Sequence, residues 1–240
     1  MFLGEARTPP GMRLYAIGDV HGCDDLLAQV HANIDADLRR KPPQSYRIVH
    51  VGDYVDRGPR SADVVGRLLR LTEAGAPIVC LSGNHEDTLL RFLDDPEGWA
   101  ATFLSFGGVA TLQSYGVDAE DAHAAGGLAH LRERFAAAMP TAHLTFLRDL
   151  PLTAQFGDFL FCHAGIRPGV PLDKQTPEDL RWIRDEFLAS ARDHGVVVVH
   201  GHTPADRPEV RRNRINIDTG AVFTGRLTCV VLEGTEYRFL

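Results

Sequence analysis

Cysteine is scarce in this 240-residue sequence, and no two cysteines stand close together. The four that occur are Cys23, Cys80, Cys162 and Cys229, without a CxxC pair among them. This spacing argues against a zinc knuckle and against a dense disulfide framework. We therefore expect reduced thiols and a cytoplasmic protein.

Long apolar runs are also missing. Residues 1–13 contain no apolar core of the length that a secretion signal requires, and no later run approaches the roughly 18 apolar residues of a membrane span. We therefore expect no membrane partner. We interpret residues 1–12 as a flexible lead-in and residues 13–240 as a single domain, because no linker divides them.

Positive charge is in deficit, since 25 lysines and arginines stand against 32 aspartates and glutamates and give a net charge of -7. This balance argues against a protein that coats nucleic acid through a basic face. Two nucleotide-binding signatures are absent as well: no GxGxxG follows the first apolar run, and no GxxxxGK[ST] occurs. Any attraction for phosphate must therefore be local.

Five short apolar runs are present, and each is long enough for a buried strand and ends in glycine and a polar side chain. They cover residues 13–19, 46–53, 77–84, 158–165 and 196–203. Between the first three runs, two segments have apolar residues at helical spacing, residues 23–40 and 60–75. The second segment closes on Gly75, a typical C-terminal cap. This order predicts parallel βαβ units.

The remaining segments have other patterns. Residues 86–151 read as helices without a clear strand, which predicts a helical insertion beside the sheet. Residues 177–193 are interpreted as one further helix. Three β-rich runs follow near the end of the chain, and we expect them to form a second sheet. They cover residues 214–220, 226–234 and 236–240.

Metal-ligating side chains follow the predicted strands. Because open α/β sheets bind ligands beyond the carboxyl ends of their strands, we expect these side chains to meet at one rim. For any one of them alone, a structural role is a credible alternative, but together they supply the mixed oxygen and nitrogen ligands that suit Mn, Fe or Zn better than Ca or Mg. They are Asp19, His21, Asp53, Asn84, His163 and His202.

Five motifs in this order resemble the calcineurin-like metallophosphoesterase superfamily: GDVHG, GDYVDRG, GNHE, HAG and GHTP. The resemblance covers roughly residues 13–220. The second and third motifs are most similar to the phosphoprotein phosphatase branch, which includes bacterial serine/threonine phosphatases and symmetric diadenosine tetraphosphatases. This resemblance implies an α/β fold in which two mainly mixed β-sheets form a sandwich flanked by helices, with a helical insertion.

The resemblance also implies a centre of two divalent or mixed-valence transition-metal ions, with manganese expected and iron or zinc as alternatives. One metal would be held by Asp19, His21 and Asp53. The other would be held by Asp53, Asn84, His163 and His202. Asp53 would therefore bridge the two ions, and His200 would be a packing or supporting residue.

By the same resemblance, His85 is the expected general acid and Asp56 orients it. Arg57 is similar to a phosphate-binding arginine of the branch. Arg184 resembles a second one, although a solvated charge on the helix of residues 177–193 is the alternative.

The implied reaction is hydrolysis of phosphate monoesters through direct attack of a hydroxide that bridges the two metals. We expect a serine/threonine protein phosphatase that acts on phosphorylated proteins. The first alternative is a symmetric bis(5'-nucleosyl)-tetraphosphatase that releases ADP from a small phosphorylated substrate. The second is a non-catalytic, metal-binding regulatory module, against which the presence of His85, Asp56 and Arg57 argues.

The insertion bears on the choice between these substrates, because a dinucleotide polyphosphatase needs additional cations and a base-stacking surface near the metals. Its aromatic residues include Phe103, Phe106 and Tyr115. We interpret them as helix core, and Trp182 likewise. The chain length and the compact insertion favour the bacterial serine/threonine phosphatase.

Overall fold

The computed structural model describes residues 1–120 and 127–240. Its first sheet has five strands in the order β10-β9-β1-β2-β3. The strands β1, β2 and β3 run parallel, as the predicted βαβ units require. They are Met12–Ile17, Ser45–His50 and Ile78–Cys80, and they are joined by β9, Cys229–Glu233, and β10, Glu236–Phe239.

The second sheet also has five strands, in the order β4-β5-β6-β8-β7. Its members are β4 Thr153–Phe156, β5 Phe159–Cys162, β6 Val197–His200, β7 Glu209–Val210 and β8 Arg214–Asn216. The expectation that the last three β-rich runs form a sheet together is wrong. Only the first of them enters this sheet, whereas β9 pairs antiparallel with β1 and carries β10 into the first sheet.

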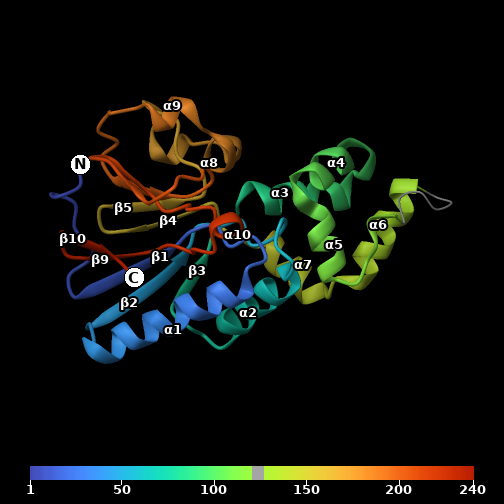
Figure 1. Ribbon diagram of the computed structural model, residues 1–240. Helices are drawn as coiled ribbons and strands as arrows, with labels where there is room; N and C mark the ends of the chain where they lie inside the picture. The colour runs from blue at the N-terminus through green and yellow to red at the C-terminus, as the bar shows by residue number, and fades with distance from the viewer. Residues whose placement is uncertain (121–126) are drawn as a thin grey trace.

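The two sheets pack face to face, and helices cover their outer faces (Figure 1). Along β1, Leu14 and Ala16 lie in the core between the sheets, and Tyr15 and Ile17 lie in the core under the helices, as the alternation of strand side chains requires. The helices α1, Asp24–Arg40, and α2, Ser61–Glu73, cover the first sheet. The short helices α8, Pro177–Trp182, and α9, Asp185–Leu188, cover the second. This arrangement confirms the expected fold class.

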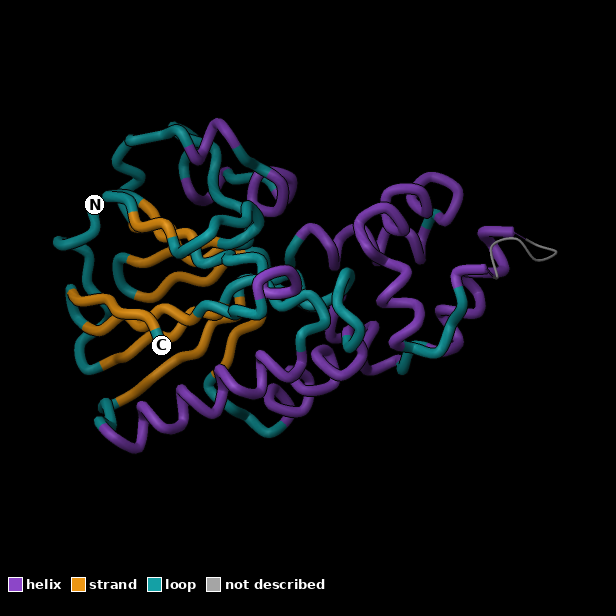
Figure 2. Tube along the Cα trace, in the orientation of Figure 1, coloured by secondary structure: helices purple, strands orange, loops and turns teal. Residues whose placement is uncertain are grey.

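The insertion is helical over its described residues and extends away from the sheets (Figure 2). It comprises α3 Asn84–Asp94, α4 Pro96–Phe103, the π-helical turn η1 Leu104–Gly108, α5 Val109–Ser114, α6 Gly127–Ala138 and α7 Thr141–Arg148. Stacked rings of Phe92, Phe103 and Phe135 form its centre. These rings belong to the same apolar core as α1 and α2, so the insertion is anchored to the sheet.

Two further segments differ from the expectations. Residues 1–12, interpreted as a flexible lead-in, make defined contacts, because Ala6 is fully buried in the core between the sheets and Met12 begins β1. The single helix expected over residues 177–193 is wrong. The chain leaves the helical conformation at Ile183 and Arg184, which separate α8 from α9. Among the described helices, none combines the length and the apolar character needed to cross a membrane.

Candidate active site

The loops that follow the strands have an unusual backbone at one rim of the sandwich. In the described part of the chain, five non-glycine residues have a positive φ angle, and every one of them belongs to the predicted site. They are His21, Asp53, Asp56, Arg57 and His202. Side chains disfavour this region by about 1 to 3 kcal/mol per residue, and such strain clusters at functional sites. The strain here is concentrated in the loops that carry the predicted chemistry.

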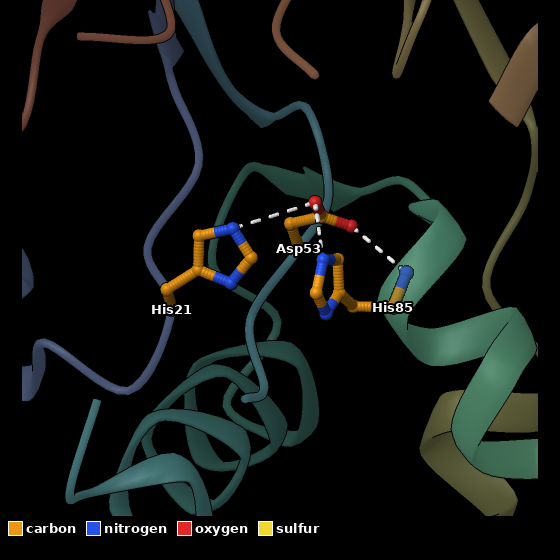
Figure 3. A group of neighbouring side chains, drawn as sticks. All are labelled: His21, Asp53 and His85. Carbon is orange, nitrogen blue, oxygen red and sulfur yellow. Dashed lines mark hydrogen bonds and ion pairs between the residues drawn. The ribbon is translucent and has the colours of Figure 1, made fainter. Parts of the chain in front are cut away.

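Asp53 lies at the centre of these loops. Its Oδ2 atom is 3.5 Å from Nε2 of His21 and 3.8 Å from Nε2 of His85, as Figure 3 shows. Its Oδ1 atom is 3.3 Å from Nε2 of His163. Two groups of candidate metal ligands therefore share this carboxylate, His21 with His85 on one side and His163 with His202 on the other, with all ligand atoms of a group within 4.8 Å of one another.

Asn84 and Asp19 join the cluster. The Oδ1 atom of Asn84 is 2.9 Å from Nε2 of His163 and 2.8 Å from Nδ1 of His202. Asp19 accepts a hydrogen bond from the backbone N–H of His202 at 3.0 Å. The structure thus brings all six predicted ligand side chains together, and all six are buried.

The burial of these groups suits cations. Oδ1 of Asp19 is buried without a hydrogen-bond partner, and burial, together with the charges of Asp218 and Asp53, raises the pKa of Asp19 well above its usual range. A cation would supply the missing partner and offset this repulsion. Burial lowers the pKa of His21 to about 3 and that of His202 to about 2, and a neutral imidazole is the form that binds a metal.

Backbone carbonyls orient two of the imidazoles. Nδ1 of His21 donates to the carbonyl oxygen of Val55 at 2.8 Å, and Nδ1 of His163 donates to that of Val51 at 3.0 Å. Each of these bonds leaves Nε2 directed at Asp53. Such bonds fix the tautomer of a metal-binding histidine, so both rings are set for ligation through Nε2.

His85 has a different partner. Its Nδ1 atom is 2.7 Å from Oδ2 of Asp56, which is fully buried. Thr111, from the insertion, donates to Oδ1 of Asp56 at 2.7 Å. Burial opposes protonation of His85, but the carboxylates of Asp53 and Asp56 outweigh it and raise the pKa of His85 above 6.5. The two carboxylates therefore favour the protonated form of His85, whose Nε2 faces the cluster.

Two exposed arginines flank the buried cluster. Arg57 places Nη1 2.8 Å from Nε2 of His21 and Nη2 3.0 Å from Nε2 of His85. On the other half of the cluster, Nε of Arg184 donates to Nε2 of His202 at 3.1 Å. Arg184 is exposed, but it is not a charge on a regular helix, because its φ of -130° and ψ of -102° lie outside the helical region. Each half of the cluster therefore has an exposed guanidinium group beside it.

The sequence interpretation assigned no role to two buried carboxylates at this site. Glu86 accepts backbone hydrogen bonds from Asp53 at 2.9 Å, Tyr54 at 2.7 Å and Gly83 at 2.8 Å. It therefore holds two ligand loops together, and its place three residues after the cap Gly83 was the available signal. Asp218 is the other carboxylate, and it follows β8. Its position after a β-rich run was the only feature of the sequence that could have indicated a place in the site.

The remaining predicted residues lie around the cluster. His200 is fully buried and its ring packs on Phe187 at 5.1 Å between centroids. Phe103 is in the core of the insertion, as expected. Phe106 and Trp182 differ from expectation, because both are half-buried and lie against site histidines, Phe106 5.5 Å from the ring of His85 and Trp182 6.4 Å from that of His202.

Comparisons with known proteins give the family of this chain. The sequence profile of the calcineurin-like phosphoesterases matches residues 12–225. The chain is 27% identical over 235 residues to bis(5'-nucleosyl)-tetraphosphatase PrpE (asymmetrical) of Bacillus velezensis, with 88% of this chain and 86% of the relative covered. It is 29% identical over 243 residues to the protein of the same name from Bacillus cereus, with 90% and 89% covered.

Solved structures show the same fold. A protein described as a "putative diadenosine tetraphosphatase" has a TM-score of 0.67 and 24% identity, with 98% of this chain and 97% of that chain covered. A cold-active protein tyrosine phosphatase has a TM-score of 0.61 and 16% identity, with 98% and 81% covered. The profile spans most of the chain and all five motifs, so the chain belongs to the calcineurin-like phosphoesterases, a family of dimetal-dependent hydrolases.

Proposed function

We propose that this phosphoesterase hydrolyses bis(5'-nucleosyl) tetraphosphates. The observation that carries the proposal is the pair of exposed guanidinium groups, Arg57 and Arg184, on the two halves of one buried cluster around Asp53. Guanidinium groups bind phosphate oxygens with charge-assisted hydrogen bonds. The curated relatives carry tetraphosphatase names, which favours a polyphosphate substrate over the phosphoprotein that we first expected.

The position of cleavage is also part of the proposal. The relatives are named asymmetrical, so we propose cleavage into a nucleoside triphosphate and a nucleoside monophosphate. The symmetric alternative considered from the sequence would give two nucleoside diphosphates. The two reactions use the same chemistry and differ in which phosphorus atom lies at the cluster.

For the metal centre we propose the ligand set predicted from the motifs, with Asp53 shared between two ions. Its members are Asp19, His21, Asp53, Asn84, His163 and His202. Bound there, two divalent cations supply the activation of water and the charge neutralisation that phosphoryl transfer needs. We propose manganese, because mixed imidazole and oxygen donors suit first-row transition metals.

The side chains around the cluster have complementary tasks. Arg57 and Arg184 bind oxygens of the phosphoryl group and neutralise their charge. His85, kept protonated by Asp56, donates its Nε2 proton to the oxygen of the leaving nucleotide. Because the expelled group is a phosphate, which is a weaker base than an alkoxide, this proton matters less here than in the hydrolysis of a serine phosphate.

Product analysis tests the proposal. Metal-stripped protein is incubated with and without manganese, once with diadenosine tetraphosphate and once with a phosphoserine peptide, and nucleotides and phosphate are separated by ion-exchange chromatography. We expect manganese-dependent ATP and AMP from the dinucleotide. ADP alone would show symmetric cleavage, and phosphate from the peptide without turnover of the dinucleotide would restore the protein phosphatase interpretation. The Asp53→Asn variant controls for contaminating hydrolases.

A further inference from the structure

Two aromatic rings, Phe106 from the insertion and Trp182 from the end of α8, stand beside each other at the rim of the cluster. Their ring centroids are 6.0 Å apart. Phe106 contacts His85, and Trp182 contacts His202. We call this pair the aromatic wall. It connects the two halves of the cluster.

The aromatic wall does not serve the apolar cores. Among the described residues, neither ring belongs to or packs against any of the three core clusters, whereas Phe103, three residues before Phe106, is fully buried and stacks on Phe92 at 4.8 Å. Both wall residues are half-buried. Both residues are therefore partly exposed beside a polar site, where an apolar surface is available to a ligand.

The chain fixes Phe106 in this place. Gly107 has a φ of 99°, which interrupts the helix at η1. A Cβ atom on Gly107 would lie 2.8 Å from the backbone nitrogen of Arg57, and that N–H donates to the carbonyl of Gly107 at 3.1 Å. The turn is thus fastened to the loop that carries Arg57. A rigid ring loses little entropy when it binds a ligand.

Each ring is also linked to one of the two arginines. Phe106 is held to the Arg57 loop by Gly107, and Trp182 precedes Arg184 by two residues. We propose that the aromatic wall stacks a nucleobase of the substrate while Arg57 and Arg184 bind the polyphosphate beside it. This nucleobase subsite rests on the proposed function for the identity of the substrate, and its test uses a binding signal that needs no turnover.

Stacking on an aromatic ring depends on the π-face that every base has, so the subsite accepts adenine and guanine alike. Loss of one stacked base weakens binding by about 10-fold, within the range found for base–aromatic stacking. The alternative is that the two rings only cover His85 and exclude water from it. In that role, their loss would change the turnover of every phosphate substrate, whether or not it contains a base. The experiments below separate these two roles.

Tryptophan fluorescence reports on the wall directly. The chain contains two tryptophans, Trp99 and Trp182, so Trp99→Phe leaves Trp182 as the sole emitter. This variant, loaded with manganese, is titrated with AMP and separately with ribose 5-phosphate, and emission is recorded within seconds of mixing. We expect saturable quenching by AMP and none by ribose 5-phosphate. Equal effects of the two compounds would overturn the subsite.

Kinetics supply the second test. Phe106→Ala should raise the KM for diadenosine tetraphosphate about 10-fold and leave the KM for inorganic tripolyphosphate unchanged. Phe106→Tyr keeps the ring and should restore the KM, which also guards against a folding defect in the alanine variant. Tyr237→Ala, which removes a 42% exposed aromatic side chain from β10, is the matched control and should change neither value.

The outcomes distinguish the subsite from the proposed function. If Phe106→Ala raises the KM for both substrates equally, or lowers kcat for both with KM unchanged, the rings are a cover and the subsite is rejected. If AMP quenches Trp182 but the wild-type protein does not cleave diadenosine tetraphosphate, the tetraphosphatase proposal fails and the nucleobase subsite stands for another nucleotide substrate.

Discussion

Nδ1 of His85 and Oδ2 of Asp56 lie 2.7 Å apart in a fully buried pair, and the other ring nitrogen of His85 faces Asp53. This relationship joins the predicted acid to the predicted ligand cluster. Asp56 is in turn fixed by Thr111, which reaches it from the insertion. The insertion therefore supports the chemistry and is not merely an appendage to the sandwich.

Replacing His85 tests its role as a proton donor. His85→Asn should leave the manganese content unchanged while it lowers kcat, because asparagine cannot supply a proton. The loss should be about 10²-fold for diadenosine tetraphosphate, at the low end for general acid catalysis, because its leaving group is a weak base. Steady-state kinetics measure kcat, and an unchanged kcat would contradict the assigned role.

Replacing the shared carboxylate should have a different effect. Asp53 lies in both groups of candidate ligands, so Asp53→Asn should weaken binding at both metal positions. His21 is a proposed ligand of one ion only, so His21→Ala should weaken binding at one position. Metal content after gel filtration, measured by atomic emission, tests this contrast. Retention of both ions by Asp53→Asn would show that Asp53 does not bridge them.

The ligand cluster could be predicted from the sequence because its residues lie directly after predicted strands. Asp19, Asp53 and Asn84 each follow a strand of one parallel group, β1 to β3, and His163 and His202 follow the parallel strands β5 and β6. Parallel strands bring their carboxyl ends to the same edge. The local pattern therefore predicted that each ligand follows a strand. The division of these strands between two sheets came from the family resemblance.

Three features could not be predicted from local pattern. The pairing of β9 with β1 joins residues more than 200 positions apart, and several sheet orders would bury these strands equally well. No glycine or proline marks the break at Arg184. The outward placement of Phe106 depends on the positive φ of Gly107 and on its close approach to Arg57, a tertiary contact that helical spacing does not contain.

The support of Asp56 by the insertion gives a further prediction. Thr111 donates to Oδ1 of Asp56 and accepts from its backbone N–H at 2.8 Å. Thr111→Val keeps the shape and leaves a buried carboxylate oxygen without its partner, which costs about 1 to 3 kcal/mol. We expect kcat to fall about 10-fold, with metal content unchanged.

Thr111→Ser is the matched control for that variant, because it keeps the hydroxyl and removes a methyl group. It should retain most of the activity. If both variants lose activity equally, packing of the methyl group is responsible, and the hydrogen bond to Asp56 is not. If neither loses activity, the hydrogen bond from Thr111 is not needed to orient the Asp56 carboxylate, and the prediction is wrong.

The stability of the sandwich should depend on pH through Asp37 of α1, whose side chain is 2% exposed. Burial alone would raise its pKa, but hydrogen bonds from Tyr15 and Arg238 outweigh burial and lower the pKa to about 2. A carboxyl group whose pKa is lower in the folded than in the unfolded state adds stability above its unfolded pKa, and this stability is lost as the pH falls through the folded pKa. The contribution is about 2 kcal/mol at neutral pH.

Urea unfolding of Asp37→Asn and of the wild-type protein, followed by circular dichroism between pH 7 and pH 2, measures this contribution. We expect the variant to be less stable by about 2 kcal/mol at pH 7, and the difference to shrink between about pH 4 and pH 2 as Asp37 of the folded wild-type protein becomes protonated. Asp35→Asn, an exposed position on the same helix, is the control. A stability difference that stayed constant across this range would show that lost packing, and not the carboxylate charge, causes the effect.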